Sequence, residues 1–65
     1  MDYVVHISRG AENVATDAIK ADSDIQAFER AKTWAAALNL APDYEAVLAV
    51  RLPSGRLKTF LRKDF

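Results

Sequence analysis

Few residues of this chain are suited to covalent or acid–base chemistry. The sequence contains one histidine, His6, and no cysteine, which excludes thiol nucleophiles, disulfides and cysteine-type zinc sites. Ser8 lies on the same side of a strand as His6 but about 7 Å further along, too far for a nucleophile and its base. Asp17, Asp22 and Asp24 are better explained by helix capping and solvated loops than by a metal ion. We therefore expect no enzyme activity, no cofactor and no metal site.

The length and composition predict one small domain spanning residues 1–65. The chain is 51% hydrophobic and 28% charged, with a formal net charge of +0. Domains of this size bury only about 60% of their unfolded surface and need efficient packing, self-association or both. No apolar run approaches the ~20 residues of a membrane span, and no basic segment precedes an apolar stretch at the start. Together with the absence of cysteine, this predicts a cytoplasmic protein without membrane contact.

Strand-like segments lie at both ends of the sequence. Residues 3–8 (YVVHIS) alternate and are rich in β-branched types, and residues 14–21 continue a weaker alternation after a break, which predicts a hairpin. Residues 44–52 (YEAVLAVRL) have an almost unbroken apolar centre, typical of a strand with neighbours on both sides. Residues 57–63 (LKTFLRK) follow a turn at residues 53–56 and are predicted to form the last strand.

A helix is predicted between the two strand pairs. Ser23 and Gln26 have capping-box spacing, and acidic residues on both sides of Ser23 favour a helix start there. Apolar residues then recur at steps of three and four: Ala27, Phe28, Ala31, Ala35 and Leu38, with Ile25 and Trp34 at the margins. Pro42 stops the helix. The order ββαββ predicts an α+β fold, a four-stranded antiparallel sheet with one helix packed on one face.

The length of the last turn decides which side chains of the final two strands share a face. A two- or four-residue loop places Leu52 opposite Leu57 and Leu48 opposite Leu61. A three-residue loop with Gly55 in a bulge instead places Val50 opposite Lys58. We predict the first register, because it turns five apolar side chains inward: Leu48, Val50, Leu52, Leu57 and Leu61.

One helix is about 10 Å wide and covers only one side of such a sheet. In the predicted register the uncovered side carries an apolar strip framed by basic residues, as protein interfaces often do. A solvated sheet face with a few apolar side chains is the ordinary alternative. The predicted partner-binding residues are Val47, Ala49, Arg51, Arg56, Lys58, Phe60 and Arg62.

Charge is segregated along the chain. Residues 1–50 contain four basic and eight acidic side chains, whereas residues 51–65 contain five basic and one acidic. The basic end predicts contact with an acidic protein surface or with nucleic-acid phosphates, although lysines on an edge strand also discourage aggregation. The overall pI of about 6.5 makes nucleic acid the less favoured partner.

The element order resembles that of a known group of proteins. A strand ending in residues 18–21 (AIKA), a capped helix with Ala27 and Ala31, and a late hairpin resemble the small ββαββ anti-CRISPR proteins of phages and mobile elements. The resemblance implies an inhibitor that binds a CRISPR–Cas effector in the bacterial host cell and blocks target DNA binding or cleavage without catalysis.

Three functions are therefore expected from different classes. The first is a non-enzymatic protein-binding module, in its most specific form an anti-CRISPR inhibitor. The second is a homodimeric accessory protein whose open sheet faces pack together. The third is a sheet-based DNA-binding module that uses Arg51, Arg56 and Lys58, which would bind with a steep salt dependence.

Overall fold

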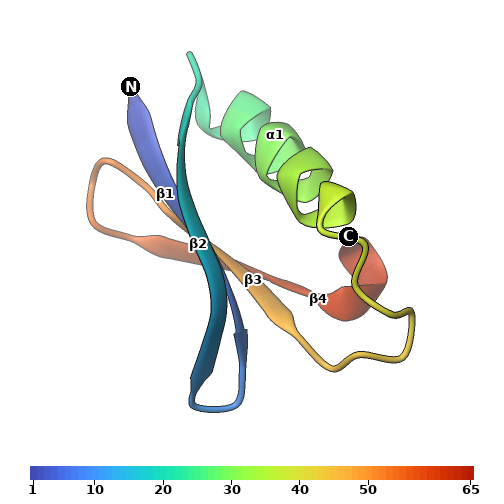
Figure 1. Ribbon diagram of the computed structural model, residues 1–65. Helices are drawn as coiled ribbons and strands as arrows, with labels where there is room; N and C mark the ends of the chain where they lie inside the picture. Colours follow the sequence, from blue (N-terminus) through green and yellow to red (C-terminus); the bar gives the residue numbers. More distant parts are fainter.

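The computed structural model describes residues 1–65. Its elements are β1 (Asp2–Arg9), β2 (Glu12–Lys20), α1 (Asp24–Ala37), β3 (Val47–Arg51), β4 (Leu57–Leu61) and a short 3-10 helix, η1 (Arg62–Asp64). The strands form one antiparallel sheet in the order β2-β1-β3-β4, and α1 lies across one face of it (Figure 1). The predicted α+β fold is confirmed, and β3 has neighbours on both sides as its apolar centre predicted.

Helix α1 begins at the predicted cap. The Ser23 side chain accepts a hydrogen bond from the backbone N–H of Gln26 at 3.2 Å, and the Gln26 side chain accepts one from the backbone N–H of Asp22 at 2.7 Å. The two bonds satisfy donors that the first helical turn leaves free. At the other end the chain leaves the helix through Asn39, whose φ of 55° is left-handed. Both ends of α1 thus follow from local sequence.

Small residues bring α1 close to the sheet. Its buried positions are Ala27, Ala31 and Ala35, so no large side chain separates the helix from the strands. The fully buried large side chains belong to the strands: Tyr3, Val5, Ile7, Leu48 and Val50. Only 11 of the 65 residues are buried, so each of the large strand residues carries a substantial share of the apolar burial.

The start of the helix is also tied to the first strand through a buried tyrosine. The Tyr3 hydroxyl donates a hydrogen bond to Asp24 Oδ1 at 2.7 Å. This bond to the Asp24 carboxylate, together with burial, raises the pKa of Tyr3 above its ordinary value of 10.0, because both favour the neutral phenol. Folding therefore keeps Tyr3 protonated to a higher pH than in the unfolded chain.

The register of β3 and β4 differs from the predicted one. Leu48 lies opposite Phe60 and Val50 opposite Lys58, so the predicted pairing of Leu48 with Leu61 is wrong by one residue, as is that of Leu52 with Leu57. The N–H of Gly55 donates to the Leu52 carbonyl at 2.9 Å, and the N–H of Leu52 donates to the Arg56 carbonyl at 2.8 Å.

The turn itself causes this register. Its two hydrogen bonds enclose a three-residue loop in which Gly55 has a φ of 91°. Glycine adopts such a conformation without the steric cost that a Cβ atom imposes, and it is the usual residue at the bulge of a three-residue hairpin loop. The backbone preference of the turn therefore prevails over the apolar pattern of β4.

The shift by one residue reverses the faces of β4. Phe60 turns toward the helix, with its ring centroid 5.6 Å from that of Phe28 in an edge-on arrangement. Leu57 and Leu61 turn to the opposite face, where they are 53% and 57% exposed. The predictions that Phe60 lies on the uncovered face and that Leu57 and Leu61 lie in the core are wrong. The inward placement of Leu48 and Val50 is confirmed.

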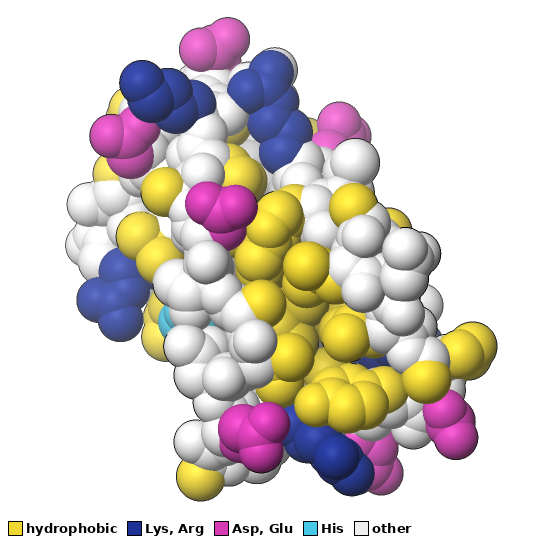
Figure 2. Space-filling view, in the orientation of Figure 1, with side chains coloured by type: hydrophobic (Ala, Val, Ile, Leu, Met, Phe, Trp, Pro, Cys, Tyr) yellow, Lys and Arg dark blue, Asp and Glu magenta, His cyan; other side chains and the backbone are white.

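A bulge bends the first hairpin. Ile7 pairs with Ala15 and Ser8 with Asn13, so Val14 is an extra residue in β2. Bulges increase the local twist, and in Figure 1 the β1–β2 hairpin crosses the β3–β4 hairpin at a steep angle. Figure 2 shows hydrophobic side chains in the space between β2 and α1. The partly buried side chains around the core include Val14 of β2 and Trp34 of α1.

Candidate protein-binding surface

The face of the sheet turned away from α1, here called the open face, is built from three rows of cross-strand neighbours. Each row takes one residue from β2, β1, β3 and β4 in turn. The rows are Ala18–Val4–Arg51–Leu57, Thr16–His6–Ala49–Thr59 and Asn13–Ser8–Val47–Leu61. Because opposite residues in an antiparallel sheet project to the same side, these twelve side chains share one surface.

The open face combines apolar and uncharged polar side chains, and the Asp2–Lys20 pair projects to the same side beyond the first row. Leu57 and Leu61 are more than half exposed, and Val4 is 39% exposed. Arg51 is the only Lys, Arg, Asp or Glu residue in the three rows. A low density of charge around exposed apolar side chains is typical of the centre of a protein–protein interface.

The structure brings together only some of the predicted partner-binding residues. Val47, Ala49 and Arg51 project to the open face, although Ala49 is only 5% exposed, and Arg56 lies in the turn opposite Leu52. Lys58 and Phe60 face the helix instead, because Val50 and Leu48 are their cross-strand neighbours. The Phe60 ring lies 4.6 Å from Lys32 Nζ and 5.6 Å from Lys58 Nζ.

Arg62 forms hydrogen bonds within the protein instead of lying free on the open face. Its guanidinium donates to the carbonyls of Leu40 at 3.0 Å and Ala41 at 3.3 Å, and also to the carbonyl of Phe65. These bonds fasten the end of the chain to the loop between α1 and β3. The five basic residues at the end of the chain therefore do not form one continuous patch.

Sequence reasoning missed several residues of the open face. Leu57 and Leu61 were predicted to lie in the core, and Val4, His6 and Thr59 were not assigned to a site. The turn contained the signal that identifies the first two: glycine as the third residue of a three-residue loop fixes the register that exposes Leu57 and Leu61. Once β4 is placed, the pairing of β1 with β3 puts Val4 and His6 in the same rows as Leu57 and Thr59.

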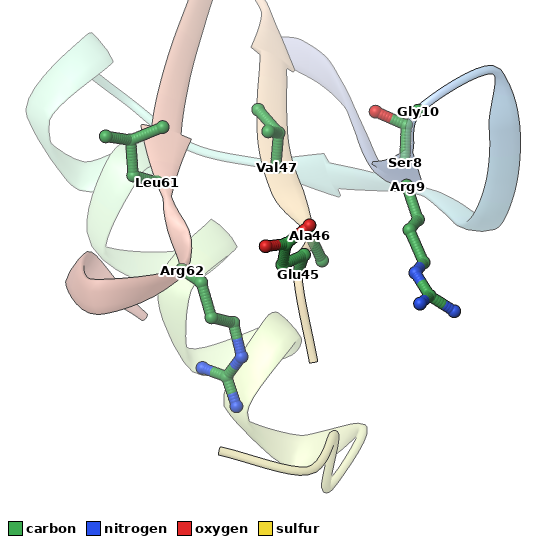
Figure 3. A pocket seen from close by; sticks show the side chains of 8 residues that line it. All are labelled: Ser8, Arg9, Gly10, Glu45, Ala46, Val47, Leu61 and Arg62. Carbon is green, nitrogen blue, oxygen red and sulfur yellow. The ribbon is translucent and has the colours of Figure 1, made fainter. Parts of the chain in front are cut away.

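A depression of about 320 Å³ continues the open face at one end. Figure 3 shows its side chains at the end of β1, the start of β3 and the end of β4. Three of its lining residues, Ser8, Val47 and Leu61, belong to the third row of the open face. The others are Arg9, Gly10, Glu45, Ala46 and Arg62. Arg9 is held at the rim by the Tyr44 ring, 4.9 Å from its guanidinium carbon. The hollow is suited to receive a side chain of a partner that lies on the open face.

Neither a membrane helix nor a metal cluster is present. Helix α1 is too short and too polar to cross a bilayer. No three His, Asp or Glu side chains are placed to hold one metal ion. No protein-family model, curated protein or solved structure matches this chain.

Proposed function

We propose that the protein is a small non-enzymatic binding module that docks its open face onto a protein partner. The observation that carries the proposal is the exposure of Leu57 and Leu61, 53% and 57%, on a face whose three rows contain a single charged residue. Full burial of a leucine side chain contributes about 1.5–3 kcal/mol. Covering the exposed parts of these two side chains would thus contribute about 2 kcal/mol to binding.

The charges beside the open face indicate the chemistry of the partner. Arg51 lies on the open face near the Asp2–Lys20 pair, whose two charges offset each other, so this end of the surface has a net positive charge. The other end is the depression beside Val47 and Leu61. An apolar protein surface bordered by acidic side chains on one side complements this arrangement, because charge complementarity speeds association and fixes orientation.

The most specific form of the proposal is an inhibitor of a CRISPR–Cas effector. The protein would occupy an apolar, acid-bordered surface of the effector inside a bacterial host cell, and target DNA would then not be bound or cut. Two features support this form: the ββαββ order resembles that of small anti-CRISPR proteins, and the open face is suited to covering a protein surface. Inhibition of this kind needs no catalytic group.

The test combines binding and inhibition. Purified protein is mixed with reconstituted CRISPR–Cas effector complexes, and co-elution and target DNA cleavage are measured, together with phage plating on a CRISPR-active host. Val4→Glu places a negative charge on the open face beside Arg51, its cross-strand neighbour. Ile25→Glu is the matched control, because Ile25 is 71% exposed but lies on α1.

We expect the wild type and Ile25→Glu to bind and inhibit equally, and Val4→Glu to weaken binding at least tenfold while keeping its fold. Equal loss in both variants would contradict docking through the open face. If no effector complex co-elutes and phage plating is unchanged, the inhibitor form is wrong. Binding to DNA alone, with a steep fall as salt rises, would instead support the sheet-based DNA-binding function.

A further inference from the structure

The two edges of the sheet differ in whether their backbone groups are already bonded. The edge strands are β2 and β4, and in an antiparallel ladder alternate residues direct their N–H and C=O groups away from the neighbouring strand. Met1 and Ala21 exchange two backbone hydrogen bonds, both 3.1 Å. Every second residue of β2 counted from Ala21 therefore bonds toward β1, and the residues between them bond away from it. Lys20, Ala18 and Thr16 therefore point outward from β2.

Side chains of the protein occupy part of the β2 edge. The outward carbonyl of Lys20 accepts a hydrogen bond from the Arg30 guanidinium. The outward N–H of Ala18 donates to Asp17 Oδ1 at 2.7 Å. Charged side chains that engage an edge strand are one of the ways in which proteins prevent unwanted strand pairing. The β2 edge is therefore protected at two of its outward backbone groups, whereas those of Thr16 are free.

The β4 edge has no such protection. The Leu52 N–H donates to the Arg56 carbonyl, so the backbone groups of Arg56 point toward β3. Lys58 and Phe60, two and four residues further along, have the same orientation and also bond toward β3. Leu57, Thr59 and Leu61 direct their backbone groups outward, and no side chain of the protein bonds to them. Their side chains also lie on the open face. A free edge about 17 Å long results.

The sequence of β4 is complementary to itself in the antiparallel direction. Its five residues read LKTFL. When two copies run antiparallel about Thr59, leucine meets leucine at both ends, Lys58 meets Phe60, and Thr59 meets Thr59. The opposed pairs that exchange hydrogen bonds are then those of residues 57, 59 and 61, whose groups point outward, which gives roughly six main-chain bonds.

We propose that β4 pairs with β4 of a second copy to form a two-fold symmetric dimer with one continuous sheet. The strand sequence favours a second copy as the occupant, because the antiparallel register pairs leucine with leucine at both ends and places each Lys58 opposite a Phe60 rather than opposite another lysine. The two Lys58 residues are staggered by two positions, so no like charges are directly opposed. On the open face, Leu57 of one copy packs beside Leu61 of the other.

The size of the contact sets the strength expected of the dimer. Pairing of five-residue strands buries less than the ~1,200 Å² of total area at which stable protein–protein interfaces begin. The dimer is therefore weak and concentration-dependent. Because the two-fold axis is perpendicular to the sheet, both open faces lie on the same side, and the dimer presents twice the binding surface of one copy. This inference concerns the β4 edge and does not depend on the proposed function.

The test measures the protein alone by sedimentation equilibrium, from about 10 μM to about 1 mM, a range that covers weak association. We expect the mass to rise from 7.2 kDa toward twice that value. Thr59→Lys places two lysines directly opposite each other at the axis and should weaken association at least tenfold. Thr16→Lys is the matched control, since Thr16 is an exposed threonine on the open face of the other edge strand.

Amide hydrogen exchange gives a second readout that needs no variant. Exchange of the Thr59 amide should slow as the concentration rises, while that of the Thr16 amide should not. A mass of 7.2 kDa at every concentration, or equal weakening by Thr16→Lys and Thr59→Lys, would overturn the proposal. A dimer that Val4→Glu also disrupts would contradict edge pairing and indicate packing between open faces. Because no effector is present, these outcomes are separate from those that test the proposed function.

Discussion

Truncating Phe60 and Leu61 separately tests the register of β4. These neighbouring side chains project to opposite faces, and Phe60 is the one that faces α1. Replacing Phe60 with alanine removes its contact with the Phe28 ring, 5.6 Å away. Replacing Leu61 removes a side chain that is 57% exposed. Phe60→Ala should therefore destabilise the protein more than Leu61→Ala.

The structure sets the size of the difference. Half-burial of a phenylalanine contributes about 1–1.5 kcal/mol to the free energy of unfolding, and an edge-on aromatic pair adds about 0.5–1.5 kcal/mol, giving about 2 kcal/mol for Phe60→Ala. For Leu61→Ala we expect about 0.5 kcal/mol. At about 4–8 °C of melting temperature per kcal/mol in a domain of this size, the two Tm values should differ by roughly 6–12 °C.

Urea denaturation monitored by circular dichroism measures both values. The protein should be dilute, about 5 μM, so that weak association of the β4 edges does not contribute. The wild type is expected to have a free energy of unfolding of about 3–10 kcal/mol, so both variants should be folded in water or nearly so. Phe60→Leu provides a milder replacement if Phe60→Ala unfolds. A larger loss in Leu61→Ala than in Phe60→Ala would refute the register and, with it, the composition of the open face.

Two further predictions concern Tyr3 and Arg62. The bond to Asp24 and burial raise the pKa of Tyr3 in the folded protein, so its contribution to stability is present below the unfolded value of 10.0 and is lost as pH rises through the raised pKa. Urea denaturation between pH about 9 and about 11 should show a steeper fall for the wild type than for Tyr3→Phe. Arg62→Met removes the bonds to the Leu40 and Ala41 carbonyls. Amide exchange in residues 38–46 should then quicken, with partner binding unchanged; weaker binding at equal stability would instead place Arg62 in the interface.

The fold was predictable because its signals are local. The pair Ser23 and Gln26 identifies the helix start within four residues, and both side chains make capping bonds. The alanines at positions 27, 31 and 35 form the buried stripe of α1. The apolar centre of residues 47–50 predicted a strand with two neighbours, which β1 and β4 provide. These features need no knowledge of distant contacts.

The composition of the open face was harder to predict because β4 offers two apolar patterns. Phe60 and Leu61 are adjacent, so either face of the strand can be made apolar by a shift of one residue. The register that turns the most leucines inward pairs Leu48 with Leu61, and it is wrong. Gly55 decides between them, because its positive φ closes a three-residue loop. At this hairpin, turn chemistry is the better guide.

The position of Arg62 depends on contacts that its sequence neighbours do not reveal. Its guanidinium reaches carbonyls 21 and 22 residues away, in a loop that approaches only when α1 and the sheet have packed. A basic residue at the end of a basic segment predicts a surface role equally well. The same limit applies to the bulge at Val14, which no residue type in the turn before it requires.

The unequal edges of the sheet also limit how large an assembly can become. A chain with two free edge strands can add copies at both ends, as amyloid-like fibrils do. Here Asp17 and Arg30 already occupy two backbone groups on the outer side of β2, whereas no side chain engages the outer side of β4. Growth through β4 is self-terminating, because a two-fold contact uses up the free edge of both copies. An assembly built through β4 alone therefore stops at two copies.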